Sequence, residues 1–342
     1  MRRRFEEAAT RDPAALATQT GMLAGQVFSV RLAGSALAAA VGPSLAHLAG
    51  KSACGNPDSG AGVALWDCAA TAITPPDVPG GADWTAAGES WRVTSHGQGR
   101  YLCEARPASL LWLDRREGQL VGCFADAGNL GCADRARPLQ RVMSELCRSL
   151  GIQEIHAGLV GRHGRGVLLV GAGGRGKTTS SLDALHDGLQ FLGDDSVAIG
   201  EGEANRLCGY SLYASARVRT EQLSRWPAFH GHWKFPAPPE EKALLLPNTF
   251  IPRHLAASVQ IAAIAIPVVA GRGVRADRVS GLAAFHALVD ESRDNRRFGM
   301  TAAEFRRVSR LTREIPCFQL EVGHDPAEVA AAIGSLIDRE AV

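Results

Sequence analysis

The feature that most constrains the fold of this chain is a glycine-rich motif set between an apolar run and a helical segment. Residues 171–178 match the pattern G-x-x-x-x-G-K-[ST] in full. The apolar run 167–170 precedes the motif as a buried strand, and residues 179–186 follow it as a helix that Gly188 ends. A strand, this loop and a helix in direct succession predict an α/β core with a phosphate-binding loop at the end of one strand.

Each residue type in this loop has a task in holding a nucleoside triphosphate. Glycines let the backbone curl so that several N–H groups point at phosphate oxygens, and the N-terminus of the following helix adds the positive end of its dipole. Lys177 is expected to reach the β- and γ-phosphates, and the Thr178 hydroxyl is expected to ligate Mg²⁺. We therefore expect ATP and Mg²⁺ as ligands, with the nucleotide held by Gly171, Ala172, Gly173, Gly174, Arg175, Gly176, Lys177, Thr178 and Thr179.

Two adjacent carboxylates, Asp194 and Asp195, follow the apolar run 189–192. Neighbouring carboxylates repel each other unless a cation offsets their charge. The helix at 179–186 is short, so its return strand is expected to lie parallel to the loop strand and beside it. With this strand order, both acids lie at the sheet edge that carries the loop. One carboxylate can then ligate Mg²⁺ while the other accepts a proton from an attacking hydroxyl.

With these motifs the chain resembles the HPr kinase/phosphorylase family, and more closely the related bacterial serine kinases that include the kinases of lasso-peptide precursors. The resemblance covers roughly residue 155 to the C-terminus. It implies a P-loop kinase core of the HPr kinase/PEP carboxykinase type that transfers the γ-phosphate of ATP to a serine-type hydroxyl of a peptide or protein. The resemblance is also compatible with a homo-oligomer. Beyond the loop, the resemblance rests on segments 155–157, 188–195, 211–213 with 216–217, and 315–323.

The resemblance also implies roles within the site. Asp195, the second acid of the pair, takes the place of the catalytic base, which leaves Asp194 to ligate Mg²⁺ together with Thr178. In the family, a histidine on the strand before the loop strand approaches the phosphates, and this position corresponds to His156. The expected catalytic residues are therefore Asp195, Lys177 and His156.

The chain is expected to divide into an N-terminal module, 1–150, and a catalytic domain, 151–342. Strand-like runs and two helical runs predict a small α+β module, with mainly antiparallel pairing and one or two helices. Residues 51–99 are rich in Gly, Pro, Ser and Asp, which indicates loops. The module lies outside the resemblance and is expected to recognise a substrate or partner. Its strand-like runs are 26–32, 109–114 and 119–124, and its helical runs are 35–48 and 138–150.

Composition argues against two classes of partner. A formal net charge of +2 gives no general attraction to nucleic acid or to an anionic membrane. Residues 32–50 carry no acidic, Lys or Arg side chain, but they are mostly Ala and Gly and are interrupted by Gly42-Pro43, which indicates a packed helix rather than a membrane span. The eight cysteines form no C-x-x-C pair. This pattern indicates free thiols in a reducing compartment, and we expect a cytoplasmic protein.

Two other functions would use the same residues. A small-molecule kinase needs the same loop and base to phosphorylate a metabolite hydroxyl, and a nucleotide-dependent switch needs the loop with little transfer. A docking groove for a peptide would favour a peptide or protein substrate. Slow hydrolysis without a phosphorylated product would favour the switch. The sequence leaves open the acceptor, the choice between ATP and GTP, and any phosphorylase activity.

Overall fold

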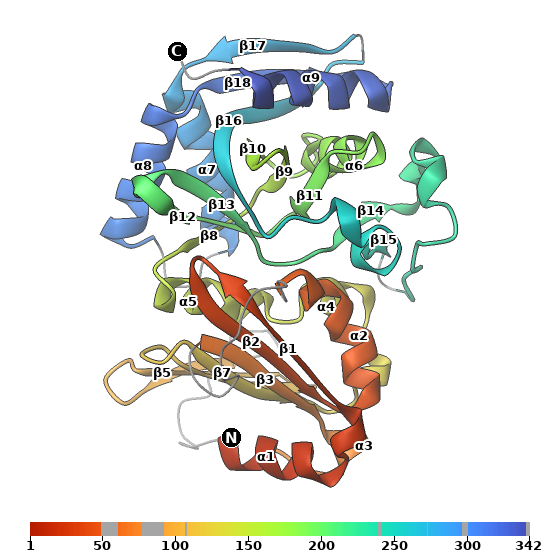
Figure 1. Ribbon diagram of the computed structural model, residues 1–342, viewed down its shortest axis with the longest axis vertical. Helices are drawn as coiled ribbons and strands as arrows, with labels where there is room; N and C mark the ends of the chain where they lie inside the picture. Colours follow the sequence, from red (N-terminus) through yellow and green to blue (C-terminus); the bar gives the residue numbers. More distant parts are fainter. Residues whose placement is uncertain are drawn as a thin grey trace. The chain divides into compact units, whose positions relative to one another are not determined.

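The computed structural model of this chain describes residues 1–48, 61–76, 92–106, 108–238, 241–271, 273–295 and 300–339. The chain divides into two compact units, Met1–Gly151 and Ile152–Val342, and most of their helices and strands are labelled in Figure 1. Each unit combines helices with a β-sheet of mixed strand direction. The protein is therefore of the mixed α/β class.

The first unit is built on a seven-stranded sheet with the order β1-β2-β3-β7-β6-β5-β4. Its pairings are antiparallel except for β2–β3 and β3–β7, which are parallel. The inner strand β3 falls in the stretch 51–99, which was expected to be rich in loops. The strands are β1 (Leu16–Leu23), β2 (Gln26–Ala33), β3 (Ala61–Asp67), β4 (Arg92–His96), β5 (Tyr101–Arg106), β6 (Ser109–Asp114) and β7 (Gln119–Phe124).

The first unit has more helices than the one or two expected. The N-terminal helix α1 packs Phe5, Ala8 and Ala9 onto the sheet face that carries Ala33 and Trp66. The spacing of these three residues marks one face of a helix, so the pattern was present although the prediction omitted this helix. The helices are α1 (Arg2–Arg11), α2 (Ser35–Leu45), α3 (Cys68–Thr71), α4 (Cys132–Ala136) and α5 (Gln140–Ser149), with short 3-10 turns η1 (Pro13–Ala15), η2 (Ala46–Leu48) and η3 (Ala127–Asn129).

Two expectations from composition can be compared with the described residues. None of their helices has the length and apolar character needed to cross a membrane. Cys54 lies outside the described residues, and the seven cysteines within them are free thiols. Burial raises the pKa of Cys103 to about 12, as is typical of a thiol in an apolar core.

The second unit holds a nine-stranded sheet. Seven strands follow the order β11-β9-β10-β16-β13-β12-β8, while β18 pairs with β16 and β17 pairs with β18. Two further strands, β14 (Ala216–Arg219) and β15 (Lys242–Leu245), form a separate small sheet. The nine strands are β8 (Gln153–Ile155), β9 (Gly158–Arg162), β10 (Arg165–Leu169), β11 (Gln190–Gly193), β12 (Val197–Glu201), β13 (Leu207–Ser211), β16 (Ser258–Val269), β17 (Arg275–Val279) and β18 (Cys317–Val322).

The neighbours of the loop strand β10 differ from the expectation. β9 lies antiparallel on one side of β10 and β16 lies parallel on the other. β11 pairs with the far side of β9, so the prediction that it lies beside β10 was wrong. The reason is a tight turn at His163 and Gly164, both with positive φ, which folds β9 directly against β10. β11 is still parallel to β10, because both strands are antiparallel to β9.

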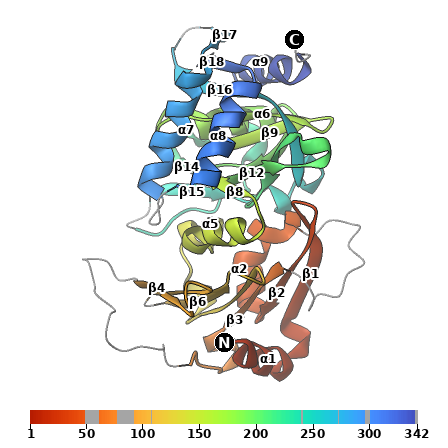
Figure 2. The same ribbon diagram turned by 90° about the vertical axis from the view of Figure 1, so that its left-hand side faces the viewer.

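Helices cover both faces of this sheet (Figure 2). Val167 and Leu169 of β10 pack with residues of α6 (Lys177–His186) and α9 (Pro326–Asp338). Leu168 packs on the opposite face with α7 (Gly281–Asn295) and α8 (Ala302–Glu314). Burial on both faces explains why residues 167–169 of this strand are all apolar instead of alternating. Short 3-10 turns complete the unit: η4 (Glu203–Asn205), η5 (Thr220–Arg225), η6 (Pro227–Phe229), η7 (Pro247–Thr249) and η8 (Pro252–His254).

Candidate functional site

The strand register brings three parts of the predicted site to one edge of the sheet. Leu169 at the end of β10 pairs with Gly158 at the start of β9, and Gly193 at the end of β11 pairs with Leu159. The ends of β10 and β11 and the start of β9 therefore share an edge. The glycine-rich loop leaves from β10, the acid pair leaves from β11, and His156 stands just before β9.

The backbone of the loop is curled in the way that its glycines permit. Gly171, Gly174 and Gly176 have φ angles of 132°, 79° and 102°. Residues that carry a Cβ rarely adopt positive φ angles of this kind. A Cβ built at Gly173 or Gly174 would meet nothing within 4 Å, so the loop is open on that side. Helix α6 begins directly after the loop, and in the described structure no side chain caps its first turn. This arrangement is suited to phosphate oxygens.

Lys177, the first residue of α6, is buried against the loop with 5% of its surface exposed. Its Nζ donates hydrogen bonds to the carbonyl oxygens of Gly171 and Ala172, the latter at 3.3 Å. The ammonium group thus lies within the curl of the loop. Four of the other predicted loop residues are exposed, namely Ala172, Gly173, Gly174 and Arg175. Three are half-buried, namely Gly176, Thr178 and Thr179.

Of the acid pair, Asp195 makes a short contact with His156. Asp194 is buried, with 2% of its surface exposed, whereas the Asp195 side chain is 21% exposed. Asp195 has a φ of 64°, and its carbonyl oxygen lies 2.8 Å from Nδ1 of His156. Because a carbonyl only accepts, this hydrogen bond requires the proton on Nδ1. Nε2 of the same ring lies 3.7 Å from Oδ1 of Asp195.

His156 does not lie on a strand, contrary to the prediction. The strand expected before the loop strand is divided into β8 and β9, and His156 lies at the bend between them. The cause is a change of partners: β8 pairs with β12, whereas β9 pairs with β10 and β11. The chain between β11 and β12 bends at the matching position, so Asp195 faces His156.

Two hydrogen bonds that sequence reasoning missed hold the acid turn. The Ser196 hydroxyl donates to Glu154 at 2.5 Å, and the Ser211 hydroxyl donates to the carbonyl oxygen of Leu192. The partners are 42 and 19 residues apart along the chain. Pairs at such separations leave no local pattern, so no sequence signal identifies them.

A buried ion pair anchors the helix that follows the loop. Asp183 of α6 is fully buried and accepts hydrogen bonds from Nε and Nη2 of Arg225, at 2.8 and 2.7 Å, and from Nε1 of Trp226 at 2.9 Å. Arg225 also donates to the carbonyl oxygens of Gly323 and His324, just beyond β18. This cluster ties α6 to the segment after β14 and to the end of β18. A charged residue at a buried position of a helix is the signal that could have indicated it.

Asp183→Ala is expected to lower the free energy of unfolding by about 3 kcal/mol, because it leaves the Arg225 cation in a mostly buried place without its carboxylate. Chemical denaturation measures this change. Arg219→Ala is the matched control, since Arg219 and Glu241 form an ion pair with 60% and 75% of their side chains exposed. The control is expected to change stability by less than about 1 kcal/mol. Equal losses in the two variants would contradict the anchoring role.

Comparisons with known proteins give a similarity among solved structures only. No protein-family model and no curated protein sequence matches this chain. Among solved structures, the chain is similar to the Hpr(Ser) kinase/phosphatase from Coxiella burnetii, with 14% sequence identity and a TM-score of 0.29. The similarity covers 54% of this chain and 93% of that one. A TM-score this low carries no argument about the function of this chain.

Proposed function

We propose that the second unit is an ATP-dependent kinase that transfers the γ-phosphate to a serine-type hydroxyl of a peptide or protein. The register of β9, β10 and β11 is the observation that supports this most, because it brings the loop and the acid pair to one sheet edge. Phosphoryl transfer asks a protein mainly for positioning and charge neutralisation. A phosphate loop with a neighbouring carboxylate provides both.

The residues at this edge fit a magnesium ion bound together with a nucleotide. Mg²⁺ prefers oxygen ligands, keeps several waters and is commonly held by one or two protein groups plus phosphates. The Thr178 hydroxyl and the Asp194 carboxylate are the oxygen donors in our proposal. When bound, Mg²⁺ would offset the negative charge of the β- and γ-phosphate oxygens.

Within this proposal each side chain has a separate task. The loop N–H groups and the Lys177 ammonium hold the phosphates, and Lys177 exchanges its contacts with the loop carbonyls for phosphate oxygens. Asp195 accepts the proton of the attacking hydroxyl, a task for which ordinary aspartate basicity suffices. His156 holds the backbone of Asp195 through Nδ1 and so fixes the turn from which the carboxylate projects.

The proposal is tested by following the label of γ-phosphate-labelled ATP. The purified full chain is incubated with Mg²⁺, the nucleotide, and a lysate or a library of serine-containing peptides. We expect the label on serine of a peptide or protein, and none when Mg²⁺ is chelated. Label only on small molecules would instead support a metabolite kinase. Release of free phosphate with no labelled product would support a nucleotide-dependent switch, and either result would contradict the proposed acceptor.

A further inference from the structure

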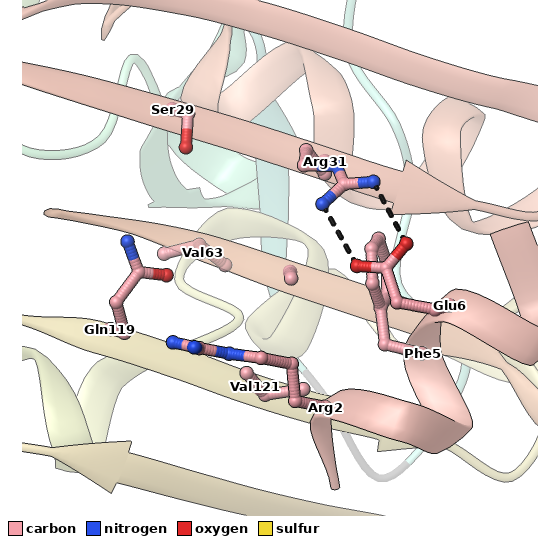
Figure 3. Close-up of a pocket in the computed structure, with 9 residues that line it drawn as sticks. Arg2, Phe5, Glu6, Ser29, Arg31, Val63, Gln119 and Val121 are labelled. Carbon is pink, nitrogen blue, oxygen red and sulfur yellow. Dashed lines mark hydrogen bonds and ion pairs between the residues drawn. The ribbon is translucent and has the colours of Figure 1, made fainter. Parts of the chain in front are cut away.

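The first unit contains a hollow that the proposed kinase chemistry does not use. It lies between α1 and the sheet face on which α1 packs, and its volume is about 220 Å³ (Figure 3). Side chains from α1, β2 and β7 surround it, with the middle strand β3 below. All of these elements belong to the same compact unit.

The residue sizes along three neighbouring strands create this hollow. Ser29 on β2, Gly62 on β3 and Gln119 on β7 stand side by side in one row of the sheet. In the row two residues further on, Arg31 pairs with Ala64. Paired residues present their side chains on the same sheet face. Gly62 therefore lies between Ser29 and Gln119, and Ala64 lies between Arg31 and Val121, so the smallest side chains occupy the middle strand. A Cβ at Gly62 would lie 2.5 Å from the Ser29 hydroxyl, which shows how tightly Ser29 occupies this space.

The polar groups around the hollow carry an excess positive charge. Arg31 donates from Nη1 and Nη2 to the Glu6 carboxylate at 3.1 and 3.3 Å, and its guanidinium lies 4.7 Å from the centroid of the Phe5 ring. These contacts offset the charge of Arg31. Arg2 contributes a second guanidinium, which extends across the hollow on the side of Gln119 (Figure 3). Within the described part of the chain Arg2 makes no ion pair, so its charge is not offset by a carboxylate there.

We infer that this hollow binds a small organic monocarboxylate. The planar guanidinium of Arg2 matches the two oxygens of a carboxylate, and Ser29 and Gln119 supply donors and acceptors for a second polar group on the ligand. The Glu6 carboxylate in the lining disfavours a dianion such as phosphate. The volume lies below the roughly 300–1,000 Å³ of common ligand pockets, so a nucleotide is too large. The apolar part of the ligand would pack on Ala64 and its neighbours.

The test uses the full chain without nucleotide, so its outcome is independent of the proposed kinase activity. Binding of a panel of short alkanoates, hydroxy acids and amino acids is measured by ligand-observed NMR and titration calorimetry. We expect at least one member to bind saturably to the wild type, and Arg2→Met to weaken that binding about tenfold or more. Arg3→Met is the matched control, because Arg3 lies next in sequence with 87% of its side chain exposed. This control is expected to bind as the wild type does.

A second variant tests the place of binding. Ala64→Leu puts a larger side chain into the middle of the hollow and is expected to abolish binding of the same carboxylate. If this variant fails to fold, the comparison of Arg2→Met with Arg3→Met still shows whether the carboxylate binds in this hollow. The inference is overturned if no carboxylate binds saturably, if Arg2→Met binds as well as the wild type, or if inorganic phosphate binds as tightly as the best carboxylate.

Discussion

Asp195→Asn is expected to reduce phosphate transfer by about 10²–10⁴-fold while nucleotide affinity stays close to that of the wild type. The amide cannot accept the proton of the attacking hydroxyl, which removes the general-base contribution. Asparagine tolerates the left-handed backbone at this position, where φ is 64°. The hydrogen bond from His156 goes to the backbone carbonyl and is retained. Turnover is measured with labelled ATP, and affinity by calorimetry.

Asp187→Asn provides the matched control for this change. Asp187 is an exposed carboxylate at the C-terminal end of α6, whereas the loop lies at the opposite end of that helix. Removing its charge is expected to leave both turnover and affinity unchanged. If the Asp195 variant retains the turnover of the wild type, Asp195 is not the base.

Lys177→Met is expected to weaken nucleotide binding by about 10- to 100-fold and to reduce transfer further. A hydrogen bond to a charged group contributes about 1.5–3 kcal/mol, and the lost ammonium group also stabilises the charge that develops during transfer. Methionine has a similar length and a high helix propensity, and it suits a position with 5% exposure. The fold should therefore persist, which a thermal unfolding curve verifies.

Lys242→Met serves as the control for the loss of a lysine charge. Lys242 is exposed at the start of β15, in the separate two-stranded sheet. Its variant is expected to bind the nucleotide with the affinity of the wild type. If the Lys177 variant binds the nucleotide as tightly as this control does, Lys177 does not contact the phosphates.

Elements with a strong local pattern could be predicted from the sequence. The expected strands 109–114 and 119–124 coincide with β6 (Ser109–Asp114) and β7 (Gln119–Phe124). The expected helix at 179–186 lies within α6 (Lys177–His186). A continuous apolar run predicts a buried strand, and apolar residues at helical spacing predict a helix. Both patterns involve only residues that are close together in the sequence. The glycine-rich motif coincides with backbone of positive φ at Gly171, Gly174 and Gly176. That this loop holds a phosphate stays a prediction. The roles of Lys177, Thr178 and the acid pair in nucleotide chemistry stay predictions.

What the sequence left undetermined depends on partners far apart along the chain. The place of β9 between β10 and β11 follows from strand pairing, and the bend at His156 follows from a change of pairing partners. Local periodicity carries no information on either choice. Asp183 and Arg225 are 42 positions apart. The place of Asp183 on its helix indicates a buried charge, but no local pattern identifies Arg225 as its partner.

A crystal structure with Mg²⁺ and a non-hydrolysable ATP analogue would test most directly whether the loop and the acids serve one reaction centre. We expect the triphosphate in the curl of residues 171–178, and a magnesium ion about 2.0–2.1 Å from oxygens of Thr178 and Asp194. The Asp195 carboxylate should lie close enough to the γ-phosphate that a single hydroxyl group of the acceptor fits between them. A triphosphate bound elsewhere, or an Asp195 side chain directed away from the γ-phosphate, would contradict the proposed kinase.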